Sequence, residues 1–474
     1  MFMGGARVAL TLISMVSSIL LARLLTAQEF GFVDMAILAI TMTSLFSGLG
    51  LSFAVIQSQL PRGPLAFHAF MITASTGAVL MVIIALGASP LAALLGNETA
   101  APIFRWLAPM VLFGGLGLIP DALMQKDMLF GRVSSIAILS ELSYVAVALI
   151  LAYSGFGVWS LVYALCVRSL LAMTANWILC PGWDWIVPQR WDWHLVRSLL
   201  SFGLTAAGGG LITFAYSMTD GFVVSRWLGT ASLGIYQRSV NLTSRSIDGI
   251  NNAVAAVLLP SYAKLQNDRA RLAQAYLRSL RLLSIVLVPI GLGMLVLAED
   301  LVVTLLDTPW LPMVVPFQLF SVISTVKPLS ATTSVLFTAV GRPGINFKAG
   351  VLVLIIMVPM IAILLPFGVG GVATAVLISQ IGGLIFNMVH ANRVLPGVAR
   401  GMVRSVRPAV VAGIIMVIAV HLGKPLIHQF TGVPAGVLDL LMLITIGVLT
   451  YGVVLLLQQR TLPGELRELL LKRS

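Results

Sequence analysis

A stripe of polar side chains runs along an otherwise apolar segment near the middle of the chain. Its members follow at steps of three, four, three and four residues: Arg238, Asn241, Arg245, Asp248 and Asn252. That spacing places all five on one face of an α-helix. Arginine binds phosphate oxygens and asparagine amides hydrogen-bond to sugar hydroxyls. The alternative is an ion pair between Arg245 and Asp248, three residues apart, that serves only packing.

The predicted depth of this stripe in a membrane is unusual for charged side chains. At about 1.5 Å per residue, Arg245 lies roughly 18 Å along the helix from Leu233. That is near the middle of a hydrocarbon core of about 30 Å. A charge there costs at least about 2.5–3.5 kcal/mol, so the stripe is expected to face protein or water rather than lipid.

The segment before this helix has a polar face of its own. Thr213, Tyr216 and Asp220 share it, so we expect the two helices to line a polar cavity. Two interpretations of Asp220 stay open. A carboxylate in a dry site can respond to protons or ions, or Asp220 can be the structural partner of Arg226 or Arg238.

Further polar residues lie in other apolar segments. Near the N-terminus, Arg7 and Ser14 belong to a fainter stripe, and we expect that helix to face the same cavity. Glu141 and Arg168 are also placed within spans, and we interpret them as a structural ion pair.

Composition identifies the elements that position these residues. The chain is 59% hydrophobic and 10% charged, with a mean hydropathy of +1.02. Apolar runs of about 20 residues recur throughout, which predicts an all-α polytopic membrane protein rather than a β-barrel. We predict about fourteen spans: 4–25, 32–57, 66–89, 102–123, 133–153, 156–179, 197–222, 233–259, 276–298, 312–338, 346–366, 369–391, 405–423 and 434–457.

The net charge of +12 reflects membrane topology. If both termini are cytoplasmic, twenty-one of the 29 lysines and arginines fall in inside segments. Only Arg23, Arg105, Arg226 and Lys424 fall outside, and the rest lie within spans. The bias predicts a cytoplasmic N-terminus and C-terminus, and it argues against a nucleic-acid partner.

Signals for cofactors and catalysis are absent from the sequence. Cys166, Cys180 and the five scattered histidines show no metal-ligand spacing, and no phosphate-binding Walker A motif occurs. The loops are too short for a soluble catalytic domain. We therefore expect no cofactor, no metal and no enzymatic activity.

An internal repeat divides the chain. ARLLTAQEFG at 22–31 matches SRWLGTASLG at 225–234, and FGVWSLVYA at 156–164 matches FGVGGVATA at 367–375, at offsets of 203 and 211. The repeat predicts six-helix lobes at 1–194 and 195–395, followed by two extra helices and a cytoplasmic tail at 396–474. An even number of helices gives both lobes the same orientation, which is typical of parallel-repeat transporters with alternating access to a cavity between the lobes.

Several segments together resemble the Wzx-type polysaccharide flippases, members of the multidrug/oligosaccharidyl-lipid/polysaccharide exporter superfamily. They are ARLLTAQEFG, GLGLSFAVIQSQ at 48–59, QKDMLFGR at 125–132, GFGVWSLV at 155–162 and TDGFVVSRWLGTASLGIYQRS at 219–239. Pro260 stands where the family's eighth helix ends, whereas Lys126 stands where the family more often has arginine. The last two helices match only in number and character.

The resemblance implies a two-lobe fold of fourteen helices. It implies that the protein moves undecaprenyl-diphosphate-linked oligosaccharide across the bacterial cytoplasmic membrane for exopolysaccharide, capsule or O-antigen assembly. A polysaccharide polymerase and chain-length machinery are the expected protein partners. On this reading Arg238 and Arg245 contact the diphosphate, and Asn241 and Asn252 contact sugars.

Two other functions were weighed against this one. A cation-coupled multidrug exporter of the same superfamily would share the fold, but a basic cavity is unsuited to a cationic drug. A membrane polysaccharide polymerase or ligase would be expected to carry a long outside loop with catalytic residues, and here the outside loops are short.

Overall fold

The computed structural model describes residues 2–48, 50–431 and 436–458, and within these ranges it contains helices and no strands. The all-α fold class is therefore confirmed. In chain order the first helices are α1 Phe2–Leu24, α2 Ala27–Gly48, α3 Leu51–Gln57, α4 Arg62–Leu86, α5 Ala88–Leu94, α6 Ala101–Leu107, α7 Pro109–Lys126, α8 Phe130–Tyr153, α9 Val158–Leu179 and α10 Trp193–Val223.

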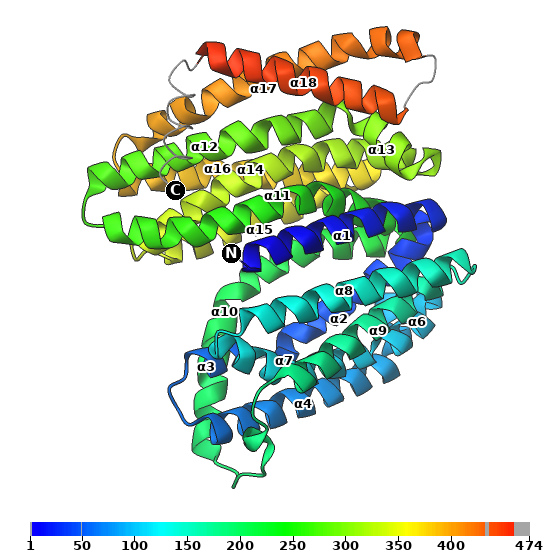
Figure 1. Ribbon diagram of the computed structural model, residues 1–474, viewed down its shortest axis with the longest axis vertical. Coiled ribbons are helices and arrows are strands. Elements are labelled where there is room, and N and C mark those ends of the chain that lie inside the picture. The colour runs from blue at the N-terminus through cyan, green and yellow to red at the C-terminus, as the bar shows by residue number, and fades with distance from the viewer. Residues whose placement is uncertain (1, 49, 432–435, 459–474) are drawn as a thin grey trace. The chain divides into compact units, whose positions relative to one another are not determined.

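The remaining helices complete the chain (Figure 1). They are α11 Thr230–Leu265, α12 Arg269–Val296, α13 Ala298–Leu306, α14 Val314–Ala339, α15 Gly344–Leu364, α16 Gly368–Val394, α17 Val398–Thr431 and α18 Val437–Gln458. Nine described segments are long and apolar enough to cross a membrane, and one of them, Gly344–Val394, contains both α15 and α16. The number fourteen stays a prediction.

Contacts group the chain into two compact units, residues 1–237 and 238–474. The first turns of α11 belong to the first unit and the rest of that helix to the second. Helix α10 packs against α2, α3 and α4, and it therefore falls within the first unit. The division at residues 194 and 395 was drawn from the repeat, and it stays a prediction.

The same pattern of packing occurs in both units. In the first, α4 packs on α7, α7 on α9, and α8 on α9; in the second, α12 packs on α14, α14 on α16, and α15 on α16. The glycine before α9, Gly157, has φ 54°, and its repeat partner Gly368, the first residue of α16, has φ 68°. Glycine takes this left-handed conformation at little cost. The sequence repeat therefore corresponds to a repeated arrangement of helices.

Helix α11 departs from the expectation at its C-terminal end. The helix does not stop at Pro260 but continues to Leu265. A proline removes one backbone hydrogen bond, but it does not prevent the next turn from forming. Here the next turn carries Tyr262, which is buried against Tyr276 of α12. That packing favours continuation of the helix.

Candidate functional site

The α10–α11 hairpin carries most of the predicted site. One turn of π-helix, Val224–Leu228, ends α10, and Gly229 with φ 86° leads into α11. The predicted stripe from 238 to 252 lies in a single unbroken helix. The side chains of Arg7, Thr213, Arg245, Asp248 and Asn252 lie outside the described residues. Their common orientation toward a cavity stays a prediction.

Asp220 is held by a hydrogen bond across the hairpin. The hydroxyl of Tyr236, a side chain with 1% exposure, donates to Asp220 Oδ2 at 2.6 Å. The backbone N–H of Gly221 donates to Oδ1 at 2.7 Å. Both carboxylate oxygens therefore have donors, so α10 and α11 are joined at this level.

Tyr236 was missed as a site residue in the sequence. It appeared only within the LGIY element of the resemblance, whereas the partners predicted for Asp220 were Arg226 and Arg238. The feature of the sequence that could have identified Tyr236 is its position relative to Asp220, on the other side of a short turn. An acid near the end of one helix and a tyrosine just inside the next can meet across a short turn, but only when the turn geometry aligns them.

Close crossing of α2 and α11 fixes the start of the hairpin's second helix. A Cβ atom on Gly31 would overlap the carbonyl oxygen of Thr230, and a Cβ atom on Gly234 would overlap that of Ala27. These are repeat-equivalent positions, since 27 and 31 become 230 and 234 at the offset of 203. The two first turns therefore contact each other reciprocally, as in an isologous interface, and only glycine permits the approach.

The other described site residues are partly exposed. Arg238, Asn241 and Tyr216 are half-buried, as is Ser14 on α1. The Ser14 hydroxyl donates to the Thr11 carbonyl of its own helix at 3.3 Å. The structure thus places a partly accessible cation and amide on α11, one turn apart, beyond Tyr236.

Among the described residues, charges within or beside the spans include two ion pairs between different helices. Arg168 Nη2 lies 3.3 Å from Glu141 Oε2, which confirms the predicted structural pair between α9 and α8. Lys424 Nζ of α17 lies 2.5 Å from Asp300 Oδ2 of α13, where Asp300 is buried. This second pair was not predicted. Its residues are far apart in sequence, and hydropathy placed each near a span end.

Basic residues at one set of loops bind backbone carbonyls. Lys126 Nζ donates to Ser58 O at 2.8 Å, and Arg132 Nη1 donates to Leu179 O at 2.8 Å. Arg62 pairs with Asp127 at 2.8 Å and also donates to Pro181 O. The QKDMLFGR segment therefore joins the α7–α8 turn to the ends of α3 and α9. Cations at the C-terminal ends of helices satisfy carbonyls that lack helical partners.

The described residues of the hairpin provide hydrogen-bonding groups and positive charge. The described part of the chain holds no group of three or more His, Cys, Asp or Glu residues that could bind a metal ion. The short bond from Tyr236 to Asp220 ties both groups to the scaffold. Among the described side chains of α11, Arg238 can donate hydrogen bonds to an anion and Asn241 can hydrogen-bond to hydroxyl groups.

Comparison with known proteins gives matches in sequence. The family model described as "Polysaccharide biosynthesis protein" matches residues 20–315. The chain is 27% identical over 292 residues to the succinoglycan biosynthesis transport protein ExoT of Rhizobium meliloti (strain 1021), covering 61% of this chain and 58% of that protein. It is 23% identical over 355 residues to the lipopolysaccharide biosynthesis protein WzxC of Escherichia coli (strain K12), covering 74% and 71%.

Comparison of structures gives a match over nearly the whole chain. The lipid II flippase MurJ, in an inward closed conformation, superposes with a TM-score of 0.80 at 15% identity. The match covers 96% of this chain and 98% of that one. At this identity the likeness shows the fold alone, which is therefore that of this flippase.

Proposed function

The chain belongs to the polysaccharide biosynthesis protein family, and from that premise we propose that it is a flippase for lipid-linked oligosaccharides. The substrate is an oligosaccharide repeat unit on undecaprenyl diphosphate, moved from the inner to the outer leaflet of the cytoplasmic membrane. The product serves exopolysaccharide, capsule or O-antigen assembly. The observation that carries this proposal is the family match over residues 20–315, which includes the whole α10–α11 hairpin.

The polar face of α11 supplies the groups that such a substrate needs. A diphosphate needs cations in a region of low dielectric, and Arg238 and Arg245 are the proposed contacts. Asn241 and Asn252 would hydrogen-bond sugar hydroxyls. In this proposal the substrate enters and leaves a cavity lined by α10 and α11. The cavity opens first to one side of the membrane and then to the other.

The substrate is expected to bind asymmetrically. At the offset of 203, the partners of Arg238 and Asn241 are Met35 and Leu38, which are buried in the first unit at 0% and 4% exposure. The first half therefore uses apolar side chains where the second uses polar ones. We propose that the diphosphate is bound by the second half of the repeat.

Deletion of the gene is the first test. Cells without the protein should accumulate the lipid-linked repeat unit and lose surface polymer, because synthesis continues while translocation stops. Labelled lipid extracts and polymer assays measure both quantities. Normal polymer with no accumulation of the intermediate would refute the proposed function.

The Arg245→Ala variant tests the binding role. We expect polymer export to be abolished while the protein still accumulates in the membrane, because one diphosphate contact is lost from a dry site. The matched control is Arg271→Ala at the start of α12, where the arginine is exposed and pairs with Asp268 three residues earlier, at 3.3 Å. Normal export by Arg245→Ala would remove Arg245 from the substrate contacts.

A further inference from the structure

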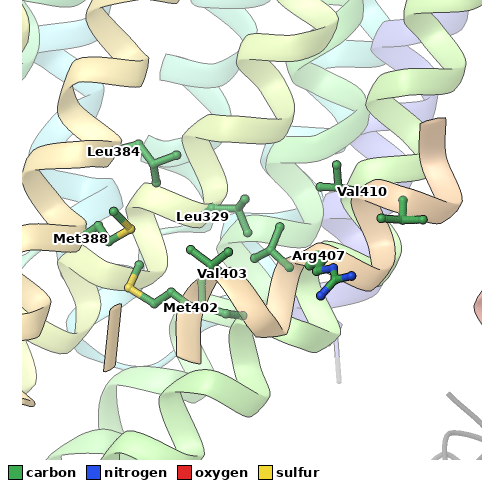
Figure 2. A pocket seen from close by; sticks show the side chains of 10 residues that line it. Leu329, Leu384, Met388, Met402, Val403, Arg407 and Val410 are labelled. Carbon is green, nitrogen blue, oxygen red and sulfur yellow. The ribbon is translucent and has the colours of Figure 1, made fainter. Parts of the chain in front are cut away.

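An apolar groove lies in the second unit, and no described residue of α10 or α11 lines it. It has a volume of about 390 Å³ and is bounded by α12, α14, α16 and α17. Figure 2 shows Met388 of α16, Leu329 of α14, and Met402 and Val403 of α17 around it. Among the described residues that line this groove, Arg407 alone carries a charge. Its guanidinium stands beside an otherwise hydrocarbon wall.

The groove opens toward the surroundings of the protein. Val403 is 57% exposed. Val410, about two helical turns further along the same face of α17, is also exposed. These apolar side chains lie on a helix long and apolar enough to cross a membrane. Such a face meets lipid, so a hydrocarbon chain can enter the groove without first passing through water.

Positive charge gathers where α12 and α17 begin. The two helices run parallel and side by side, since Leu277 packs against Gly401 and Val288 packs against Gly413. The Tyr276 hydroxyl also lies 3.6 Å from Met402 Sδ. This register sets the third and fourth turns of α12 beside the first three turns of α17. These stretches carry the arginines 278 and 281 of α12 and 400, 404 and 407 of α17.

Acidic residues are absent from the corresponding stretches of sequence. Residues 272–298 and 396–438 contain no Asp or Glu. Within these two stretches the basic residues therefore outnumber the acidic ones, and Arg407 is the one that lines the groove among its described residues. Basic pockets between membrane helices on the cytoplasmic side bind anionic lipid headgroups, and the charge bias of the sequence predicts that this side is cytoplasmic.

We infer that the groove is a binding site for an anionic glycerophospholipid. An acyl chain fills the space between α14, α16 and α17, and the headgroup phosphate accepts hydrogen bonds from Arg407. The site is distinct from the polar face of α11. Its occupant is a resident membrane lipid, and the combination of an apolar channel with one arginine at its wall matches a phosphodiester attached to a hydrocarbon chain.

Lipid-dependent thermal unfolding of the purified full-length protein in detergent tests this site. We expect phosphatidylglycerol to raise the Tm in a saturable way, and phosphatidylcholine, which has the same chains but no net charge, to raise it far less. Arg407→Gln should weaken the apparent affinity for phosphatidylglycerol by about tenfold, the loss of one charge-assisted hydrogen bond.

Two further variants separate the headgroup from the chain. Val403→Trp should fill the groove and abolish stabilisation by phosphatidylglycerol, and the exposed position of Val403 lets the protein fold. Arg393→Gln is the matched control. Arg393 lies in the last turn of α16, is exposed, and does not line the groove. This variant should retain the affinity of the unmodified protein.

Two outcomes would overturn the inference. Equal loss of affinity in Arg393→Gln and Arg407→Gln would mean that phosphatidylglycerol adsorbs to a general basic surface. Displacement of phosphatidylglycerol by an equimolar amount of undecaprenyl phosphate would assign the groove to the isoprenoid chain instead. Binding is measured without transport, so either result leaves the flippase proposal to its own tests.

Discussion

Asp220 has the surroundings of a tethered carboxylate rather than of a free one. Tyr236 and the Gly221 N–H occupy its two oxygens. Breaking such a bond leaves a polar group without its partner, and a hydrogen bond to a charged group contributes about 1.5–3 kcal/mol. At the scale of single residues, the pair therefore stabilises the hairpin from which the polar face of α11 extends.

The Tyr236→Phe variant should lower the stability of the protein by about 1.5–3 kcal/mol, because it removes the hydroxyl that donates to Asp220 Oδ2. Thermal or denaturant unfolding in detergent measures the change. Tyr153→Phe is the control, since Tyr153 is 76% exposed at the end of α8. If both variants unfold alike, the bond across the hairpin contributes nothing to stability.

At the scale of elements, the crossing of α2 and α11 joins the two halves of the sequence repeat. Equivalent residues contact each other there, with Gly31 against Thr230 and Gly234 against Ala27. Helix backbones this close leave no space for a methyl group. The glycines that end the matched segments ARLLTAQEFG and SRWLGTASLG, Gly31 and Gly234, therefore have a packing role.

Alanine at either crossing glycine should force α2 and α11 apart. Gly31→Ala or Gly234→Ala should cost about 1–3 kcal/mol or more through overpacking. The double variant should cost less than the sum, because the first methyl group already separates the helices. Thermal unfolding and membrane yield measure the effect. Gly452→Ala in α18, where a Cβ meets open space, should be neutral; an equal loss there would contradict the explanation.

A second element-scale contact ties α13 to α17. Lys424→Met should cost about 3–5 kcal/mol, because it leaves the buried Asp300 without its cation. The double variant Asp300→Asn with Lys424→Met should recover much of that loss, because the buried charge is then gone as well. Unfolding curves of the three proteins are compared. A single variant as stable as the unmodified protein would exclude this role.

At the scale of the whole molecule, basic residues have two roles at once. Arg62, Lys126 and Arg132 belong to the inside segments that set the predicted orientation, and each also binds a backbone carbonyl. Cations at these loops can therefore satisfy helix ends and also contribute to the charge bias that predicts a cytoplasmic location for that side of the protein.

Reporter fusions test the predicted orientation. A fluorescent protein fused after Ser474 should fold and fluoresce, because the C-terminus is predicted to be cytoplasmic. Alkaline phosphatase fused after residue 434, between the last two spans, should be active because that position is predicted to lie outside. Active alkaline phosphatase fused after Ser474 would contradict the predicted cytoplasmic location of the C-terminus.

Hydropathy found the centres of helices better than their ends. The span predicted at 405–423 lies within α17, Val398–Thr431, and the one predicted at 276–298 belongs to α12, which begins at Arg269. The turns at the starts of α12 and α17 that lie outside the predicted spans carry arginines. Arginine is compatible with a helix, but it interrupts a run of apolar residues. Asp268 caps α12 by accepting from the Arg271 N–H at 3.1 Å. That contact is local, yet a hydropathy pattern does not contain it.

The sequence by itself determined the all-helical membrane class, the internal repeat, the family and the Glu141–Arg168 pair. The class, the repeat and the pair follow from apolar run length, constant offsets and charges too costly to leave alone in lipid, and the family follows from the resemblance of several segments to known flippases. All are properties read along the chain. The tertiary structure decided that Tyr236 holds Asp220, that Lys424 meets Asp300, that Gly31 and Gly234 are crossing points, and that four helices enclose a groove beside Arg407. Each depends on the distance between side chains on different helices, and packing sets the register and separation of those helices. The periodicity of residues along the sequence does not contain that distance.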